Sequence, residues 1–275
     1  MSVSVKQGFY CALAALLVAL APVRAHADSA GLGLNPGRAE VEVMPGEEKT
    51  VSFRIDSPPS EQPVRGHLLL SLTDWKINQD TSVTYVDPGS LPDSAAKWVV
   101  FSPSSLSIDS GQSQLVRVTV RVPEGTTKGV YRAGVFVQER PPAAPPKPGE
   151  HVMMFRFRYL FSLYVMVGQL SGEGHLADLH SIPEHDGVRI ICEMNNTGTR
   201  HVRPYIDATL RDSHGNTVAA LKRYEATVLL PSATNEEAIT ISDLPPGHYE
   251  IEAQVDFQDG HPIQAIKRGI EVPIS

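Results

Sequence analysis

Three histidines recur at intervals of five residues in the segment HLADLHSIPEH, with carboxylates between and beside them. Imidazole and carboxylate groups are common ligands of zinc and similar transition metals, so this segment is a candidate metal site. An interval of five residues, however, matches no helical i,i+4 pair, and on a strand it places successive side chains on opposite faces. We therefore expect solvated loop histidines, with no metal and no cofactor, from the set His175, His180, His185, Asp178, Glu184 and Asp186.

Nucleophilic chemistry is the second possibility, because Cys192 lies within the apolar segment VRIICEM. A cysteine among apolar side chains is usually a buried, inert hydrophobe, and no nucleophile–base pattern accompanies this one. The sequence also lacks a recognisable nucleophile elbow, phosphate-binding glycine loop, zinc-protease helix or pair of catalytic carboxylates. We predict that the protein is not an enzyme; the alternative is a hydrolase whose site is assembled from separate loops.

The N-terminal residues have the pattern of an export signal, with Lys6, an apolar stretch and the small-x-small cleavage site AHA at 25–27. Cleavage removes 27 of the 275 residues and leaves 248, enough for two domains. It also removes Cys11, so the mature chain has one cysteine and no intramolecular disulfide. The removed segment contains the basic residues Lys6 and Arg24 and no acidic residue, so cleavage changes the net charge from −7 to −9. An acidic chain without a second long apolar segment is expected to be periplasmic or secreted, to bind no nucleic acid and to insert in no membrane.

The elements that must position any site are strands. From Gly31 onward, short apolar alternations are interrupted roughly every eight to twelve residues by glycine, proline, aspartate or asparagine, which is typical of β-sandwiches. In the first half we predict strands at 39–43, 49–56, 67–75, 83–85, 98–102, 113–122, 129–138 and from 152 onward. In the second half we predict strands at 175–180, 187–195, 203–212, 217–228, 237–242, 248–257 and 264–272.

The two halves repeat one order of events: a turn, a strand, a Pro/Gly corner and then a tyrosine that opens an alternating strand. Tyr131 and Tyr249 therefore occupy the position of the tyrosine corner of immunoglobulin-like folds, a structural role. The predicted fold is all-β, with two tandem immunoglobulin-like β-sandwiches. We place a signal peptide at 1–27, an N-terminal domain at 30–170 and a C-terminal domain at 171–275.

The most apolar segment after the signal is HVMMFRFRYLFSLYVMVG at 151–168, which we interpret as one long strand. Its first face is wholly apolar: Met153, Phe155, Phe157, Tyr159, Phe161, Leu163, Val165 and Val167. Its second face is mixed: Val152, Met154, Arg156, Arg158, Leu160, Ser162, Tyr164 and Met166. In one interpretation the first face fills the core and the neighbouring domain covers part of the second. In the other, part of the strand is an open edge for a partner's strand.

The first domain resembles a known family in the order of its segments. PGEEKTVSFRID, SAAKWVVFSPSSLSIDSGQSQLVRVTVRVP and GVYRAGVFVQE, followed by a loop and a long apolar strand, resemble the periplasmic pilus-assembly chaperones of the PapD-like superfamily. The later NNTGTRHVRPYIDATLRDSHGNTV and VLLP are similar to the C-terminal immunoglobulin-like domain of exported PapD-like proteins. The resemblance covers most of the mature chain.

This resemblance implies a chaperone that lends the last strand of its first domain to a pilin subunit and anchors the subunit's C-terminal carboxylate with basic cleft residues. It identifies 152–167 as the donor strand, with Met153, Phe155, Phe157, Tyr159, Phe161 and Leu163 as the partner-binding side chains. The candidate carboxylate anchors are Arg38, Arg156 and Arg158; their alternative role is that of strand residues with solvated heads or local carboxylate partners. The expected partners are subunits of a pilus or surface fibre, and the alternative function is a secreted structural or adhesive module without chaperone activity.

Overall fold

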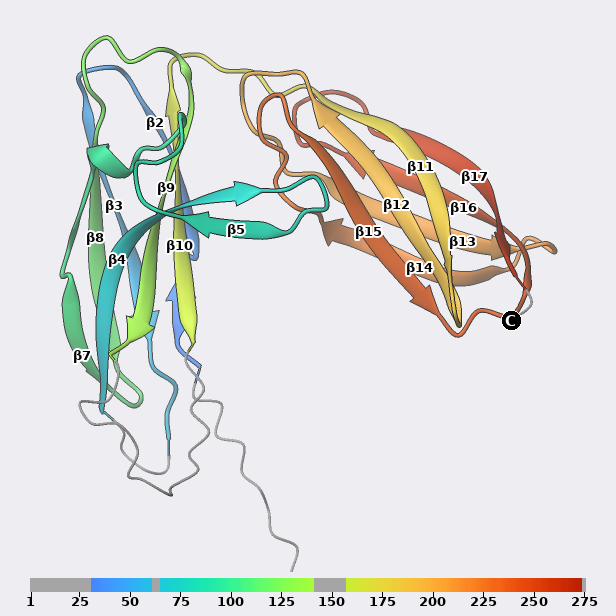
Figure 1. The fold of residues 1–275 in the computed structure, drawn as a ribbon, viewed down its shortest axis with the longest axis horizontal. Helices are drawn as coiled ribbons and strands as arrows, with labels where there is room; N and C mark the ends of the chain where they lie inside the picture. The colour runs from blue at the N-terminus through green and yellow to red at the C-terminus, as the bar shows by residue number, and fades with distance from the viewer. Residues whose placement is uncertain (1–30, 61–64, 141–156, 274–275) are drawn as a thin grey trace, which may run out of the picture.

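The chain folds into two β-sandwiches (Figure 1). The computed structural model describes residues 31–60, 65–140 and 157–273, so the predicted signal peptide lies outside the described residues. The second sandwich extends sideways from one end of the first (Figure 1). The all-β prediction with two tandem sandwiches is confirmed. No helix in the described part of the chain is long and apolar enough to cross a membrane.

The first sandwich packs two sheets around one core. One sheet has the order β1 (Gly33–Asn35), β3 (Glu48–Asp56), β8 (Ser113–Arg121) and β6 (Val99–Ser102). The other has the order β2 (Arg38–Val43), β10 (Arg158–Val167), β9 (Gly129–Glu139), β4 (Arg65–Ile77) and β5 (Val83–Val86), and β7 (Ser105–Asp109) also pairs with β4. A short 3₁₀ helix, η1 (Ala96–Trp98), precedes β6. Period-two alternation turns the apolar side chains inward, where Phe53 of β3 stacks on Phe161 of β10 at a centroid distance of 4.3 Å.

The second sandwich follows after a short connection. One sheet has the order β11 (Gly174–Glu184), β12 (Gly187–Asn196) and β15 (Thr234–Ser242). The other has the order β14 (Thr217–Glu225), β13 (Tyr205–Asp212), β16 (Gly247–Asp256) and β17 (Gln264–Val272). Its core includes Leu179, Ile190, Met194, Ile206 and Leu210, all nearly inaccessible to solvent.

Every predicted strand is present, with ends that differ by a few residues, and the described part of the long strand begins at Arg158. Two strands were missed, β1 and β7. β1 has only three residues, too few to show alternation, and β7 begins at Ser105, the last residue of the turn segment SPSS. Both tyrosines donate a hydroxyl hydrogen bond four residues upstream: Tyr131 to the Thr127 carbonyl (3.1 Å) and Tyr249 to the Pro245 carbonyl (2.7 Å).

Candidate functional site

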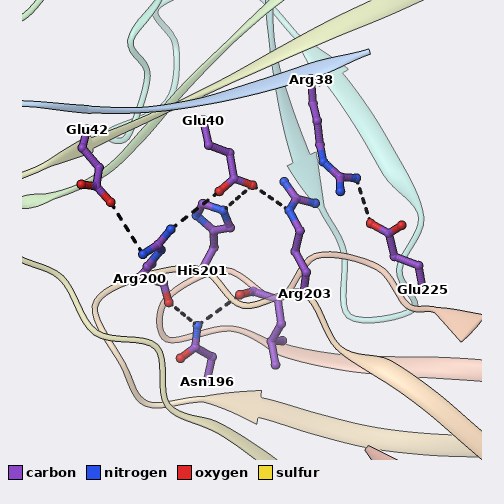
Figure 2. Close-up of polar contacts among 9 residues, drawn as sticks. Arg38, Glu40, Glu42, Asn196, Arg200, His201, Arg203 and Glu225 are labelled. Atoms are coloured by element: carbon purple, nitrogen blue, oxygen red, sulfur yellow. Dashed lines mark hydrogen bonds and ion pairs between the residues drawn. The ribbon is translucent and has the colours of Figure 1, made fainter. Parts of the chain in front are cut away.

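Strand β2 presents three charged side chains in a row to the second domain. Val41 and Val43 point into the first core, so the alternate residues Arg38, Glu40 and Glu42 point away from it. Their partners come from the second domain, as Figure 2 shows, and we call the set Arg38, Glu40, Glu42, Arg200, His201, Arg203 and Glu225 the inter-domain ion cluster.

The three basic residues of the second domain lie on the loop after β12, and a buried asparagine shapes that loop. The Asn196 side-chain carbonyl accepts hydrogen bonds from the Gly198 and Glu173 amides. Its amide donates to the carbonyls of Arg200 (2.8 Å) and Leu229 (3.1 Å) (Figure 2). Short polar side chains form such turns readily, and the Asn196 side chain fixes the backbone that carries the three basic residues.

Glu40 is the centre of the inter-domain ion cluster (Figure 2). Its Oε1 lies 2.7 Å from Arg203 Nε and 3.1 Å from His201 Nε2, and its Oε2 lies 4.0 Å from Arg200. The His201 side chain is 2% exposed and that of Arg203 is 18% exposed, so both hydrogen bonds are largely shielded from water. The hydrogen bond from His201, followed by that from Arg203, lowers the pKa of Glu40 to about 2 despite partial burial. Glu40 is therefore ionised at every physiological pH.

The remaining charges form looser pairs at the edge of the cluster. Arg38 Nη1 lies 2.8 Å from Glu225 Oε1 at the end of β14, with both side chains nearly half exposed. Arg200 lies 3.7 Å from Glu42. Each arginine of the cluster thus has a carboxylate within 4.0 Å, so the basic residues here are neutralised rather than free.

An apolar cluster adjoins the ion cluster. Trp75, Val130, Tyr164 and Met166 of the first domain are buried with Val228 of the second. The Tyr164 ring lies 4.7 Å from the His201 ring, and the Arg203 guanidinium lies over it at 4.9 Å. Burial raises the pKa of Tyr164, which keeps its phenol neutral. The mixed face of β10 is therefore covered by the second domain at Tyr164 and Met166.

A cavity of about 490 Å³ borders the inter-domain ion cluster. Its lining combines Glu40, Arg200, His201 and Arg203 with Asp259 and His261 from the loop after β16. The ion cluster therefore borders open space on one side, where the Arg200 side chain is 40% exposed.

One edge of strand β10 pairs with β2 in its second half and with no described strand in its first half. β2 pairs with it in parallel from Ser162↔Arg38 to Val167↔Val43. The Ser162 amide donates to the Gly37 carbonyl (3.1 Å), so by alternation the N–H and C=O of Leu160 and Arg158 point to the same side. No described strand pairs with that side before Ser162, so among the described residues the first part of β10 forms a free edge.

The predicted partner-binding side chains have different environments. Phe157 is 56% exposed, whereas Phe161 and Leu163 are completely buried in the first core. Tyr159 is half-buried, and its hydroxyl accepts a hydrogen bond from the Leu32 amide (2.9 Å). Met153 and Phe155 lie outside the described residues. The apolar face of β10 is thus core from Phe161 on, because β3 stacks against it there.

Of the three candidate anchors, one lies in the inter-domain ion cluster. Arg38 is a member of it, whereas Arg158 donates to Gln138 (3.0 Å) and lies over the Phe136 ring at 4.6 Å. Arg158 precedes Ser162, the residue opposite Arg38, by four positions, about 13 Å along the strand. Arg156 lies outside the described residues. Arg38 and Arg158 therefore do not converge on one carboxylate.

The other candidates do not form a chemical site. Along β11, His180 lies 3.6 Å from Asp178, and His175 lies 3.1 Å from the Thr197 hydroxyl. No group of three metal-ligating side chains forms within residues 31–60, 65–140 and 157–273. Cys192 is fully buried, as predicted for a small hydrophobe, and burial raises its pKa to about 12.

Similar solved structures exist, although no protein-family profile and no curated protein sequence matches the chain. A structure of a chaperone–tip adhesin complex of CFA/I fimbriae biogenesis is 12% identical with a TM-score of 0.45, covering 89% of this chain and 100% of that one. The class 5 fimbriae chaperone CfaA is 13% identical (TM-score 0.44), with 89% and 100% covered. The YadV chaperone is 14% identical (TM-score 0.43), with 88% and 99% covered. Fimbrial chaperones recur among these structures.

Sequence reasoning missed most of the inter-domain ion cluster. Glu40, Arg200, His201 and Arg203 were not predicted, although two signals were present. Charged residues alternate on one face of the segment RAEVEV, and three of the four residues of RHVR are basic. Neither signal alone identifies a site. What was missing is the contact between the two segments, more than 150 positions apart in the chain, as the Glu40–Arg203 separation of 163 shows.

Proposed function

We propose that the protein is a periplasmic, chaperone-like protein that binds subunits of a pilus or another surface fibre by pairing a subunit strand with β10. The observation that carries this proposal is the free edge of β10 before Ser162. Unpaired N–H and C=O groups at a sheet edge are a template for another strand, and neighbouring side chains then set the register. The expected export signal and the segment order shared with PapD-like chaperones agree with this role.

The side chains near the free edge suit an apolar partner. Phe157, directly before β10, is 56% exposed, and Phe155 and Met153 stand at alternate positions before it in the sequence, outside the described residues. Burying a phenylalanine that is half exposed contributes about 1 kcal/mol. We propose that the donated segment is the part of 152–167 before Phe161, since the later residues are committed to the core.

Arg38 is the proposed anchor for a subunit carboxylate. It contacts Glu225 through Nη1 alone, and an ion pair this exposed contributes about 0–1 kcal/mol. A carboxylate that approached Nε and Nη2 would form a bidentate pair, which is stronger and more directional. The contact with Glu225 is therefore no barrier to such an anchor.

The test compares two substitutions at one exposed edge residue. Arg158→Pro removes a backbone donor from the free edge and leaves the pairing with β9 intact, because the Arg158 N–H, by alternation from the Ser162 N–H that donates to Gly37, points away from β9. Arg158→Ala removes the side chain but keeps the N–H. The wild type and Arg158→Ala are expected to capture a fibre subunit from the periplasm of the source cell, identified by mass spectrometry, and Arg158→Pro to lose it. Equal capture by a folded Arg158→Pro protein would contradict strand pairing at this edge.

A structural or adhesive module is the second candidate, and one observation favours it. Glu40 and Glu225 neutralise Arg203 and Arg38, so the inter-domain contact already satisfies its own charges. In this alternative the two domains form a fixed unit that packs against other envelope proteins. It predicts that neither substitution at Arg158 changes partner binding, which separates the two functions in the same experiment.

A further inference from the structure

The last residues of β4 and the whole of β5 form a two-stranded hairpin that reaches from the first sandwich toward the second (Figure 1). β4 pairs with β9 from Leu68 to Thr73, whereas Asp74 to Ile77 pair with β5. A two-stranded hairpin is marginally stable in water unless other contacts support it. The position of this hairpin therefore depends on what its base and its tip contact.

Hydrogen bonds within the hairpin fix the shape of its tip, residues 78–82. The Asn78 amide donates to the Ser82 carbonyl (2.9 Å), and the Asn78 side chain donates to the Ser82 hydroxyl (2.9 Å). The Asp80 carboxylate accepts a further bond from the Ser82 amide (3.1 Å). Short polar side chains stabilise turns in this way. Gln79 takes part in none of these bonds, and the turn presents it to the second domain.

Gln79 forms a two-point contact with Glu236 of β15. The Gln79 carbonyl accepts a hydrogen bond from the Glu236 amide (2.6 Å), and the Gln79 side-chain amide donates to the Glu236 carboxylate (2.6 Å). Asn235 and Glu237, on either side of Glu236, are buried in the second domain. The hairpin tip is thus attached to a fixed part of β15, and two bonds between one pair of residues restrict rotation as well as separation.

The hairpin and the inter-domain ion cluster contact the second domain from opposite edges of one sheet. The order of this sheet is β2, β10, β9, β4 and β5, with Glu40 of the ion cluster on β2. At roughly 4.8 Å between neighbouring strands, four intervals separate the two contacts by about 19 Å. The strands between them contribute Trp75 and Tyr164 to the apolar cluster with Val228, and Ile77 of the hairpin packs against that cluster.

A connection and a single patch of contacts leave a domain free to rock about that patch, and relative motion is the default for two domains of one chain. Leu170 and Gly172 of the connection border the same cavity as the ion cluster, so both lie on one side of the contact. A second contact on the opposite edge resists rocking, because the displacement there grows with the distance from the axis. We infer that the β4–β5 hairpin is a strut that holds the second domain at a fixed angle to the first.

The strut gives the space between the two domains a constant shape. A partner that touches both domains would then meet a preorganised surface and lose less conformational entropy on binding. The inference itself does not depend on what the free edge of β10 binds, because the contacts that carry it lie within the chain.

The distance between two spin labels, one on each domain, tests the strut. Leu115→Cys on β8 and Val218→Cys on β14 carry the labels, since the native side chains are 53% and 45% exposed, whereas Cys192 is fully buried. In the strut-free variant, residues 78–82 are replaced by Asn-Gly, a two-residue turn that keeps the hairpin. We expect double electron–electron resonance to give one narrow distance distribution for the labelled parent and one at least twice as broad for the strut-free protein.

Two proline substitutions on β15 distinguish loss of the strut from damage to the strand. Glu236→Pro removes the amide that donates to Gln79 and keeps the pairing with β12, because that amide points away from β12. Thr240→Pro is the matched control: by alternation the Thr240 amide faces the same side, where it has no partner among the described residues. We expect Glu236→Pro to broaden the distribution and Thr240→Pro to leave it unchanged.

The outcomes of these measurements decide the inference. Equal widths for the parent and the folded strut-free protein would overturn it, because the connection and the ion cluster would then suffice to hold the angle. Broadening by Thr240→Pro as large as that by Glu236→Pro would also overturn it. If circular dichroism shows that the strut-free variant does not fold, the comparison of Glu236→Pro with Thr240→Pro decides alone.

Discussion

Replacing Glu40 with glutamine tests whether the inter-domain ion cluster stabilises the protein. The pKa of Glu40 falls from the ordinary 4.5 to about 2 in the folded protein. At about 1.4 kcal/mol per pKa unit this difference corresponds to roughly 3 kcal/mol. The Glu40 side chain is 27% exposed, and solvent screening reduces the contribution, so we expect Glu40→Gln to lower the free energy of unfolding by about 2 kcal/mol at pH 7.

The pH dependence of this loss has a definite sign. A carboxylate whose pKa is lower in the folded state stabilises that state when it is ionised, above the unfolded pKa, and the contribution disappears as the pH falls through the folded pKa. The contribution of the Glu40 carboxylate to the difference between wild type and Glu40→Gln is therefore fully present above the unfolded pKa of 4.5. It should shrink as the pH falls from 4.5 toward 2.

The assay is urea unfolding followed by tryptophan fluorescence. Trp75 is buried in the apolar cluster between the domains, so in a Trp98→Phe background its emission reports on that contact. Glu42→Gln is the matched control, two positions along the same strand, because Glu42 is 70% exposed and 3.7 Å from Arg200. Glu42→Gln should lower the free energy of unfolding by less than about 0.5 kcal/mol. Equal losses for the two variants, or a Glu40 difference that grows as the pH falls from 4.5 toward 2, would refute the reasoning.

Three further predictions concern the two cores. Phe161→Ala should lower the free energy of unfolding by about 3–5 kcal/mol, measured by urea titration, because the ring is fully buried and stacks on Phe53; a loss below 1 kcal/mol would contradict its place in the core. Cys192 should react with a thiol reagent only after denaturation, since its pKa is raised to about 12, and fast labelling of the native protein would contradict this. Tyr249→Phe should cost about 1 kcal/mol through the lost bond to Pro245, an effect that a thermal melt would detect.

The strands of both sandwiches could be predicted because their signal is local. Alternation along β8, SQLVRVTVR, places every second residue in the core, and the structure buries Val116, Val118 and Val120 accordingly. The tyrosine corners follow from a similar local pattern. Strand β1, with three residues, is too short for a periodic signal.

The inter-domain ion cluster could not be predicted, for a physical reason. Arg38 carries one sign of charge and Glu40 the other, and a segment with mixed charges is usually a solvated strand face. Only the folded structure shows that the face of β2 with Glu40 contacts Arg203. Because Arg203 is largely buried, its contact shields the Glu40 carboxylate from solvent. The change along β10 from an unpaired edge to an edge paired with β2 could not be predicted either. Alternation assigns side chains to faces of a strand but does not show where the neighbouring strand begins.

Between Asn35 and Arg38 the chain passes from one sheet of the first domain to the other. The position of this crossing determines both the extent of the free edge of β10 and the composition of the inter-domain ion cluster. β1 pairs with β3 as far as Asn35, the chain then crosses to the other sheet, and β2 begins at Arg38 opposite Ser162. A later crossing would lengthen the free edge of β10 and remove Arg38 from the cluster; an earlier one would cover Leu160 and Arg158. Because strand residues alternate, a shift by a single residue would also turn Glu40 into the core. The position of this crossing therefore fixes how much of β10 is available to a partner and, at the same time, how the second domain is held.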